Sequence, residues 1–155
     1  MHKKYSLFLI TLLSFNFVAC SNIQPTIDIY NKEYSFETAQ QHGDVIQKKG
    51  KVYNIEKLDT FVEKYNSNEG NSVRITRFNE KGEPLIIDLT VKKGTKTTSL
   101  YYDVDYTKTS DHDKESEGIQ YSNSTCQKIL KEISSNSVTY KLQCPEIIDL
   151  VQLPK

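Results

Sequence analysis

The stretch Ser72–Val91, SVRITRFNEKGEPLIIDLTV, changes the spacing of the apolar residues to two. Val73 and Ile75 start the alternation, and after the turn Asn79–Gly82 it returns in Leu85, Ile87, Leu89 and Val91. Side chains two residues apart lie on the same face of a β-strand. The stretch therefore predicts two antiparallel strands joined by a tight turn, with one apolar face.

A third strand is expected after the turn at Lys93 and Gly94. Within residues 97–105, Leu100, Tyr102 and Val104 share one face. Three strands joined by short turns are typical of an antiparallel meander. One face of this sheet would pack on helices, and the other would meet water or a partner.

Two helices are expected upstream of the sheet. Ser35 is suited to cap the first, which would run to a stop at Gly50 with apolar positions at Phe36, Ala39, Gly43 and Ile46. Residues 51–53 then form an extended link. Asn54 is suited to cap the second helix, whose apolar stripe is Ile55, Leu58, Phe61, Val62 and Tyr65.

The N-terminus is typical of a secretory signal. His2, Lys3 and Lys4 precede the apolar run Tyr5–Val18, which ends at the small residue Ala19. The run is too short to span the ~30 Å hydrocarbon layer as a permanent helix. Cys20 directly after Ala19 resembles the lipobox of bacterial lipoproteins. That resemblance implies cleavage before Cys20 and diacylation of its thiol; an ordinary secretory signal with an incidental cysteine is the alternative.

This interpretation divides the chain into a signal peptide (1–19), a lipidated tether (20–34) and a single α+β domain (35–155). A first strand at Thr26–Tyr30 is the alternative for part of the tether. Two acyl chains give stable membrane attachment where one does not. The protein is therefore expected on the outer face of the cell membrane.

Residues 119–133 fit two structures. Ile129, Leu130 and Ile133 suit a helix, whereas Tyr121, Asn123 and Thr125 favour a strand, so residues 126–133 stay open between the two, with the strand favoured. Val138, Tyr140 and Leu142 predict a strand after a turn at 134–137. The apolar tail Ile147–Leu153 would either dock on the domain or stay loose.

The cysteines support the extended alternative. With Cys20 acylated, Cys126 and Cys144 remain in an oxidising compartment, where disulfides persist. Their residue numbers add up to 270, which centres a hairpin on residue 135, inside the turn. We therefore expect an α+β fold with two helices packed on an antiparallel sheet of about five strands, and a C-terminal hairpin stapled by a Cys126–Cys144 disulfide.

Charge excludes one class of partner. The chain has 20 basic and 20 acidic residues, and the signal removes Lys3 and Lys4, which leaves 18 against 20 and a formal charge of −2. Nucleic-acid binding calls for a basic face. We expect no nucleic-acid partner.

The acidic stretch 103–117 is the strongest candidate for a metal site. A calcium loop needs glycine at its sixth position and a bidentate acid at its twelfth. Those positions are Lys108 and Lys114 counted from Asp103, and Ser116 and Ser122 counted from Asp111. An exposed, solvated loop over 106–118 is therefore favoured, with a looser divalent-cation site as the alternative.

Catalytic patterns are not found. His42 and His112 are 70 positions apart, too far for a zinc pair, and Asp44 would lie on a different side of a helix from His42. Arg74 and Arg77 lie on opposite faces of one strand and cannot clamp one carboxylate together. No catalytic, cofactor-binding or metal-binding residue is assigned.

Three strings look like a known family: HGDVIQKKGKVYNIEKLDTFVEKY, VRITRFNEKGEPLIIDL and YKLQC. They resemble small lipoproteins of Gram-positive, bacillus-type bacteria that are classed as a domain of unknown function. The resemblance covers Gln40–Cys144. It implies a lipoprotein with a compact α+β domain and supplies no activity.

The expected function is a non-catalytic binding or interaction module, held to membrane lipid through Cys20, with an unknown protein or envelope component as its partner. A ligand binder that uses the 103–117 loop for a divalent cation is the first alternative. A hydrolase with an unconventional site is the second.

Overall fold

The computed structural model of the protein describes residues 34–95, 98–110 and 119–155. In these ranges the elements follow in the order α1 (Phe36–His42), β1 (Val45–Lys48), β2 (Lys51–Tyr53), α2 (Ile55–Asn66), β3 (Asn71–Phe78), β4 (Pro84–Lys93), β5 (Thr98–Asp105), β6 (Tyr121–Cys126), β7 (Lys128–Ile133), β8 (Ser137–Gln143) and β9 (Ile147–Pro154). The expected α+β class and both helices are confirmed.

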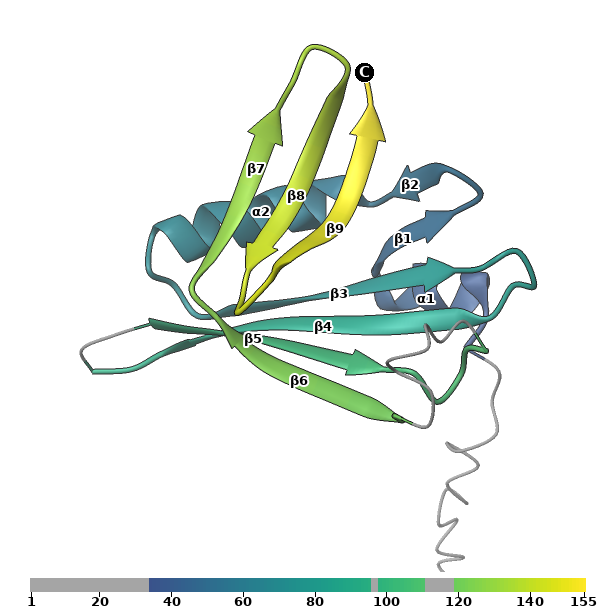
Figure 1. Ribbon diagram of the computed structural model, residues 1–155, viewed down its shortest axis with the longest axis horizontal. Helices are drawn as coiled ribbons and strands as arrows, with labels where there is room; N and C mark the ends of the chain where they lie inside the picture. The colour runs from purple at the N-terminus through teal and green to yellow at the C-terminus, as the bar shows by residue number, and fades with distance from the viewer. Residues whose placement is uncertain (1–33, 96–97, 111–118) are drawn as a thin grey trace, which may run out of the picture. The chain divides into compact units, whose positions relative to one another are not determined.

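The strands form two sheets (Figure 1). A six-stranded sheet has the order β2-β1-β3-β4-β5-β6, and a three-stranded sheet has the order β7-β8-β9. Strand β1 runs parallel to β3, whereas the other neighbours are antiparallel. The expectation of a single antiparallel sheet of about five strands was wrong, because β1 and β2 add strands to the larger sheet, β1 is parallel to β3, and β7–β9 form a sheet of their own.

The central hairpin forms as predicted. Strands β3 and β4 pair from Asn71 opposite Val91 to Phe78 opposite Pro84. Gly82 in the turn has φ of 86°, in the left-handed region that glycine tolerates best. Strand β5 extends the meander, and Leu100 and Val104 on it are buried as expected.

The first helix ends earlier than predicted. The Ser35 hydroxyl accepts a hydrogen bond from the Thr38 amide at 3.2 Å, so the predicted cap is confirmed. Gly43 then adopts φ 74° and ψ 31°, and its amide donates to the carbonyl of Gln40 at 3.0 Å. A left-handed residue at this position terminates a helix. The predicted continuation to Gly50 was therefore wrong, and Ile46 lies on β1.

Residues 51–53 are a paired strand rather than a link. Lys48 and Lys51 are opposite each other across β1 and β2, and the two residues between them have positive φ, 49° at Lys49 and 72° at Gly50. Two left-handed residues in a two-residue loop make the hairpin turn that matches strand twist.

Helix α2 starts where predicted, but Asn54 does not cap it with its side chain. Asn54 has φ of 57° and makes no side-chain cap; its amide Nδ2 instead donates to the Asp44 carbonyl at 2.7 Å. The predicted stripe is confirmed, since Leu58, Phe61 and Val62 are buried. No helix of the described residues is long and apolar enough to cross a membrane.

The C-terminal segment is extended, as favoured, but is split between the two sheets. Strand β6 pairs with β5, and β7 pairs with β8 from Lys128 opposite Gln143 to Ile133 opposite Val138. The predicted hairpin around residue 135 is therefore present, but its pairs each add up to 271 rather than 270, and Cys126 lies just outside it at the end of β6. The apolar tail is docked, because it forms β9 beside β8.

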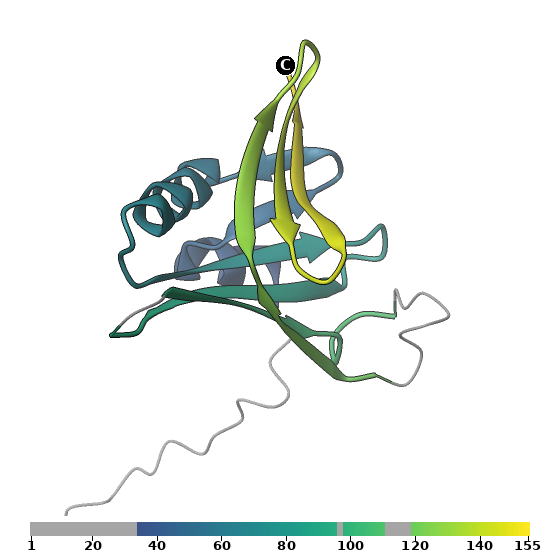
Figure 2. The same ribbon diagram turned by 60° about the vertical axis from the view of Figure 1, so that its left-hand side comes forward.

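The predicted disulfide is present. Cys126 at the end of β6 is bonded to Cys144, which follows β8, with 4.0 Å between their Cα atoms. The bond therefore ties the edge of the six-stranded sheet to the three-stranded sheet. Figure 2 shows the chain passing from β6 into β7 near this junction.

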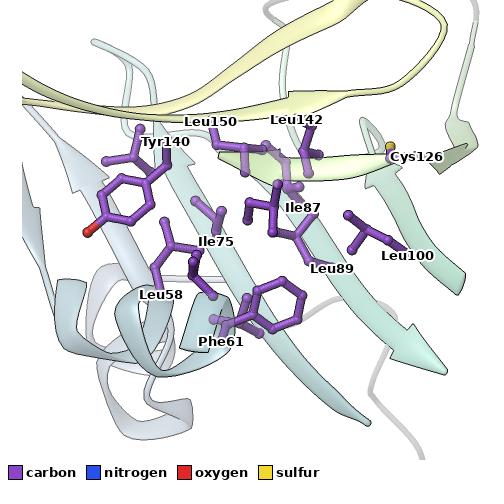
Figure 3. Close-up of a cluster of buried hydrophobic side chains, with 14 of the residues drawn as sticks. Leu58, Phe61, Ile75, Ile87, Leu89, Leu100, Cys126, Tyr140, Leu142 and Leu150 are labelled. Atoms are coloured by element: carbon purple, nitrogen blue, oxygen red, sulfur yellow. The ribbon is translucent and has the colours of Figure 1, made fainter. Parts of the chain in front are cut away.

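One core joins both sheets to α2. Figure 3 shows Leu58 and Phe61 of α2 directed towards Ile75, Ile87 and Leu89, with Tyr140, Leu142 and Leu150 of the second sheet on the other side. The Tyr140 hydroxyl donates to Asp59 Oδ1 on α2 at 2.6 Å. A smaller cluster of Ala39, Ile46 and Phe78 holds α1 against the sheet.

Candidate functional site

A row of polar residues crosses the six-stranded sheet on the face opposite the shared core, here called the back face. Arg74, Asp88, Asp103 and Asn123 are opposite one another on β3, β4, β5 and β6. Asp44 precedes Val45, which pairs with Ile75, so Asp44 lies at the same level beside Arg74. Adjacent residues on these strands point into the core, so strand alternation alone puts this row on the back face.

Arg74 and Asp88 form the best-defined ion pair of the row. Arg74 Nε donates to Asp88 Oδ1 at 2.8 Å, and Nη2 donates to Oδ2 at 2.7 Å. The hydrogen bonds from the guanidinium to Asp88 raise the pKa of Arg74 above its usual value, against the effect of partial burial. A bidentate pair of this kind fixes the orientation of both side chains.

Asp44 is a buried carboxylate with two hydroxyl donors. Its side chain is 3% exposed. Its Oδ2 atom accepts from the hydroxyl of Tyr34 at 2.7 Å and from that of Thr76 at 2.6 Å. Burial and the hydrogen bond to Asp44 raise the pKa of Tyr34. These donors satisfy a buried acid that would otherwise be costly.

Tyr34 also links Asp44 to His42. The Tyr34 oxygen lies 3.0 Å from His42 Nδ1. Because the hydroxyl hydrogen goes to Asp44, the tyrosine oxygen is the acceptor, which assigns the hydrogen to Nδ1. The expectation that His42 and Asp44 lie on different sides of one helix was wrong, since the helix ends at His42 and Gly43 turns the chain.

These residues border a groove of about 1020 Å³. Its lining comes from the end of α1, the outer side of α2 and the start of β3 with the back face beside it: His42, Gly43, Asp44, Glu56, Lys57, Thr60, Lys64, Asn71, Ser72, Val73, Arg74, Asp88, Thr90 and Asp103. Ligand pockets in proteins typically measure about 300–1,000 Å³. The groove is therefore large enough for a ligand of several residues or sugar units.

Two cations of the groove are not in ion pairs. Within the described residues, the salt bridges leave out Lys57 and Lys64 of α2, whereas Arg74 is held by Asp88. The two lysines are exposed and seven residues apart, so both lie on the side of α2 that lines the groove. Glu56 and Asp103 of the same lining are also outside these salt bridges, so the attraction for an anionic group is local to the two lysines.

A smaller cavity of about 480 Å³ lies beside Arg77. Arg77 Nη2 donates to the carbonyls of Asp149 and Leu150. In the β8–β9 pairing Tyr140 is opposite Val151 and Lys141 is opposite Asp149, which leaves Leu150 as the extra residue of a bulge. Arg77 thus fixes the bulge to β3, and its opposite orientation from Arg74 is confirmed. Burial lowers the pKa of Arg77.

The acidic stretch gives no metal site among the described residues. Asp103 lines the groove, and Asp105 Oδ1 accepts from the amide and hydroxyl of Thr107 at 2.8 and 2.6 Å. Residues 111–118, with His112, lie outside the described part of the chain, as does Cys20. No group of three or more metal-binding side chains occurs in the ranges that the structure covers.

A family model matches residues 42–141, the domain of unknown function DUF4362. The chain belongs to this family. The match starts at His42 and ends within β8, so it contains every residue that lines the groove. Searches of curated proteins and of solved structures found no match to the chain. The family description assigns no activity to the DUF4362 domain.

Proposed function

We propose that this DUF4362 domain is a non-catalytic binding module that is held on the outer face of the cell membrane by acylated Cys20 and receives an anionic ligand in the groove. The observation that carries the proposal is the groove of about 1020 Å³ with Lys57 and Lys64 unpaired on one wall. The N-terminal sequence supports the anchor, because a basic start, an apolar run and Ala19 precede Cys20.

Binding fits the site better than proton transfer does. Asp44 is engaged by Tyr34 and Thr76, and Asp88 is engaged by both nitrogens of the Arg74 fork. A general acid or base needs to reach a proton on the substrate. These carboxylates instead hold the shape of the groove, while the lysines remain available for a ligand.

The anchor would keep the groove near the membrane. Tyr34, which contacts Asp44 and His42, is 14 residues after Cys20. An extended chain spans at most about 3.6 Å per residue, so the groove would lie within roughly 50 Å of the lipid surface. Ligands attached to the membrane or to the inner part of the envelope are within this reach.

Replacing the anchoring cysteine should release the protein. In a Cys20→Ala variant the thiol that accepts lipid is absent, so the protein should appear in the medium or remain as uncleaved precursor. Metabolic labelling with a fatty-acid analogue, followed by gel analysis, checks this. Label should mark the wild type alone, and label retained on the variant would show that the acyl chain is attached elsewhere.

Photocrosslinking in intact cells tests the groove. A photoreactive amino acid in place of Thr60, which is exposed on the groove wall, should give a discrete adduct on irradiation. The matched control places it at Asn136, exposed in the β7–β8 turn away from the groove lining. Equal adducts from both positions, or none from Thr60, would remove the groove as the binding site.

A further inference from the structure

One side of β3 is open at the start of the strand. Strand β3 pairs with β4 along Asn71–Phe78, but on its other side β1 pairs only with Ile75–Phe78, and Asp44 lies beside Arg74. Asn71, Ser72 and Val73 therefore have no neighbouring strand on that side. An open strand edge presents main-chain N–H and C=O groups that can pair with another chain.

The groove runs along this open edge. Asn71, Ser72, Val73 and Arg74 all line it, although their side chains alternate between the two faces of the sheet. Four consecutive lining residues indicate that the strand edge itself borders the groove. The outer side of α2 forms the facing wall through Glu56, Lys57, Thr60 and Lys64.

The length of the open strand edge and the charges on α2 indicate which ligand would fit the groove. Three residues of an added strand would extend about 10 Å at ~3.3 Å per residue, along the open part of β3. Peptides that add to a sheet edge gain affinity from main-chain hydrogen bonds and specificity from alternate side chains. Side chains that face α2 would meet Lys57 and Lys64, so acidic residues fit on that side.

We infer that the ligand of the groove is an extended acidic peptide segment that pairs as a strand with Asn71–Val73 and places carboxylates against Lys57 and Lys64. The inference rests on the proposed binding function and specifies its ligand. Strand β6, an outermost strand of the sheet, differs from this edge because none of its residues lines either of the two cavities.

Peptide binding to the purified, processed protein tests the inference. The probe is a fluorescent, end-blocked hexapeptide of sequence Thr-Glu-Val-Glu-Val-Thr, and its control has both glutamates replaced by lysine. Fluorescence anisotropy should show saturable binding of the acidic probe and at least about tenfold weaker binding of the control, which reverses two charges. Equal binding of the two would contradict the acidic preference.

N-methylation of the peptide distinguishes main-chain pairing from charge attraction. In a strand only every second amide points to the neighbouring strand. Probes N-methylated at one alternate set of positions should lose binding, while probes methylated at the other set should keep it. If both sets bind alike, the contact is through side chains and strand addition is wrong.

Variants of the protein complete the test. The double variant Lys57→Ala with Lys64→Ala should bind the probe about five- to tenfold more weakly, because two exposed ion pairs are lost. Lys128→Ala, an exposed lysine of the second sheet, is the control and should bind as the wild type does. No probe binding together with persistent Thr60 crosslinking would overturn the peptide inference alone; loss of both would overturn the proposed function as well.

Discussion

Replacing Phe61 with alanine should lower the free energy of unfolding by about 3–5 kcal/mol. Phe61 is fully buried on α2 and belongs to the core that α2 shares with both sheets (Figure 3). The truncation removes its contacts and leaves a cavity between the helix and β3. Since domains are typically stable by about 5–15 kcal/mol, this loss is a large part of the total.

Denaturant titration of the purified domain measures the effect. Glu63→Ala on the same helix is the matched control, because Glu63 is exposed and its loss should change stability by less than about 0.5 kcal/mol. If the two variants were equally stable, α2 would not be packed on the sheets as described, and the groove wall that carries Lys57 and Lys64 would have no fixed position.

Removing the disulfide should cost about 3 kcal/mol, the chain-entropy value for a link between residues 18 apart. The variant Cys126→Ser with Cys144→Ser should therefore melt about 10 °C lower, at a few degrees per kcal/mol for a domain of this size. The decrease in stability should be largest in β7–β9, because the disulfide links the two sheets covalently in addition to the backbone at Gln127.

Calorimetry gives the melting temperature, and mass spectrometry of the unreduced protein should show the two cysteine peptides joined. Membrane attachment should be unchanged, since Cys20 is retained. Cys126 and Cys144 that react freely with an alkylating reagent, in protein taken from the cell surface, would show that the bond does not form there.

Local patterns predicted the elements whose stability comes from one apolar face. The alternation in Ser72–Val91 predicted strands β3 and β4, and the stripe from Ile55 to Tyr65 predicted α2, because burial of one face requires that spacing. Ser35 was also recognisable as a cap, because the hydrogen bond that its hydroxyl accepts comes from an amide only three residues away.

Pairing between distant segments was not predictable in this way. Alternation identifies a strand but not its neighbour, so residues 119–133 were expected to form one arm of the C-terminal hairpin, although Tyr121–Cys126 pairs with β5. The parallel β1 was missed because Gly43 was treated as a weak helix residue rather than as the left-handed residue that ends the helix. The sequence signal for the end of the helix and the start of β1 was Gly43 followed by Asp44 and the apolar pair Val45 and Ile46.

The groove depends on those missed pairings. The groove combines two separate stretches of the chain, one with Tyr34 and Asp44 and the other with Arg74 and Thr76 of β3. They meet only because β1 lies beside β3. These residue types are common in ordinary strands and turns, so the sequence contained no motif to mark them. The opposite orientations of Arg74 and Arg77 were predictable, since parity along one strand decides them.

The most direct test is the yield of the Thr60 crosslink in intact cells, compared between the protein with its lysines and a Lys57→Glu, Lys64→Glu version. Both versions keep Cys20, the proposed anchor, and the buried core, so their surface amounts should match and can be normalised. An anionic ligand in the groove predicts that reversing both charges reduces the adduct by about tenfold or more. An undiminished adduct at equal surface amount would contradict the account, because the groove would then hold its ligand without the two lysines that define it.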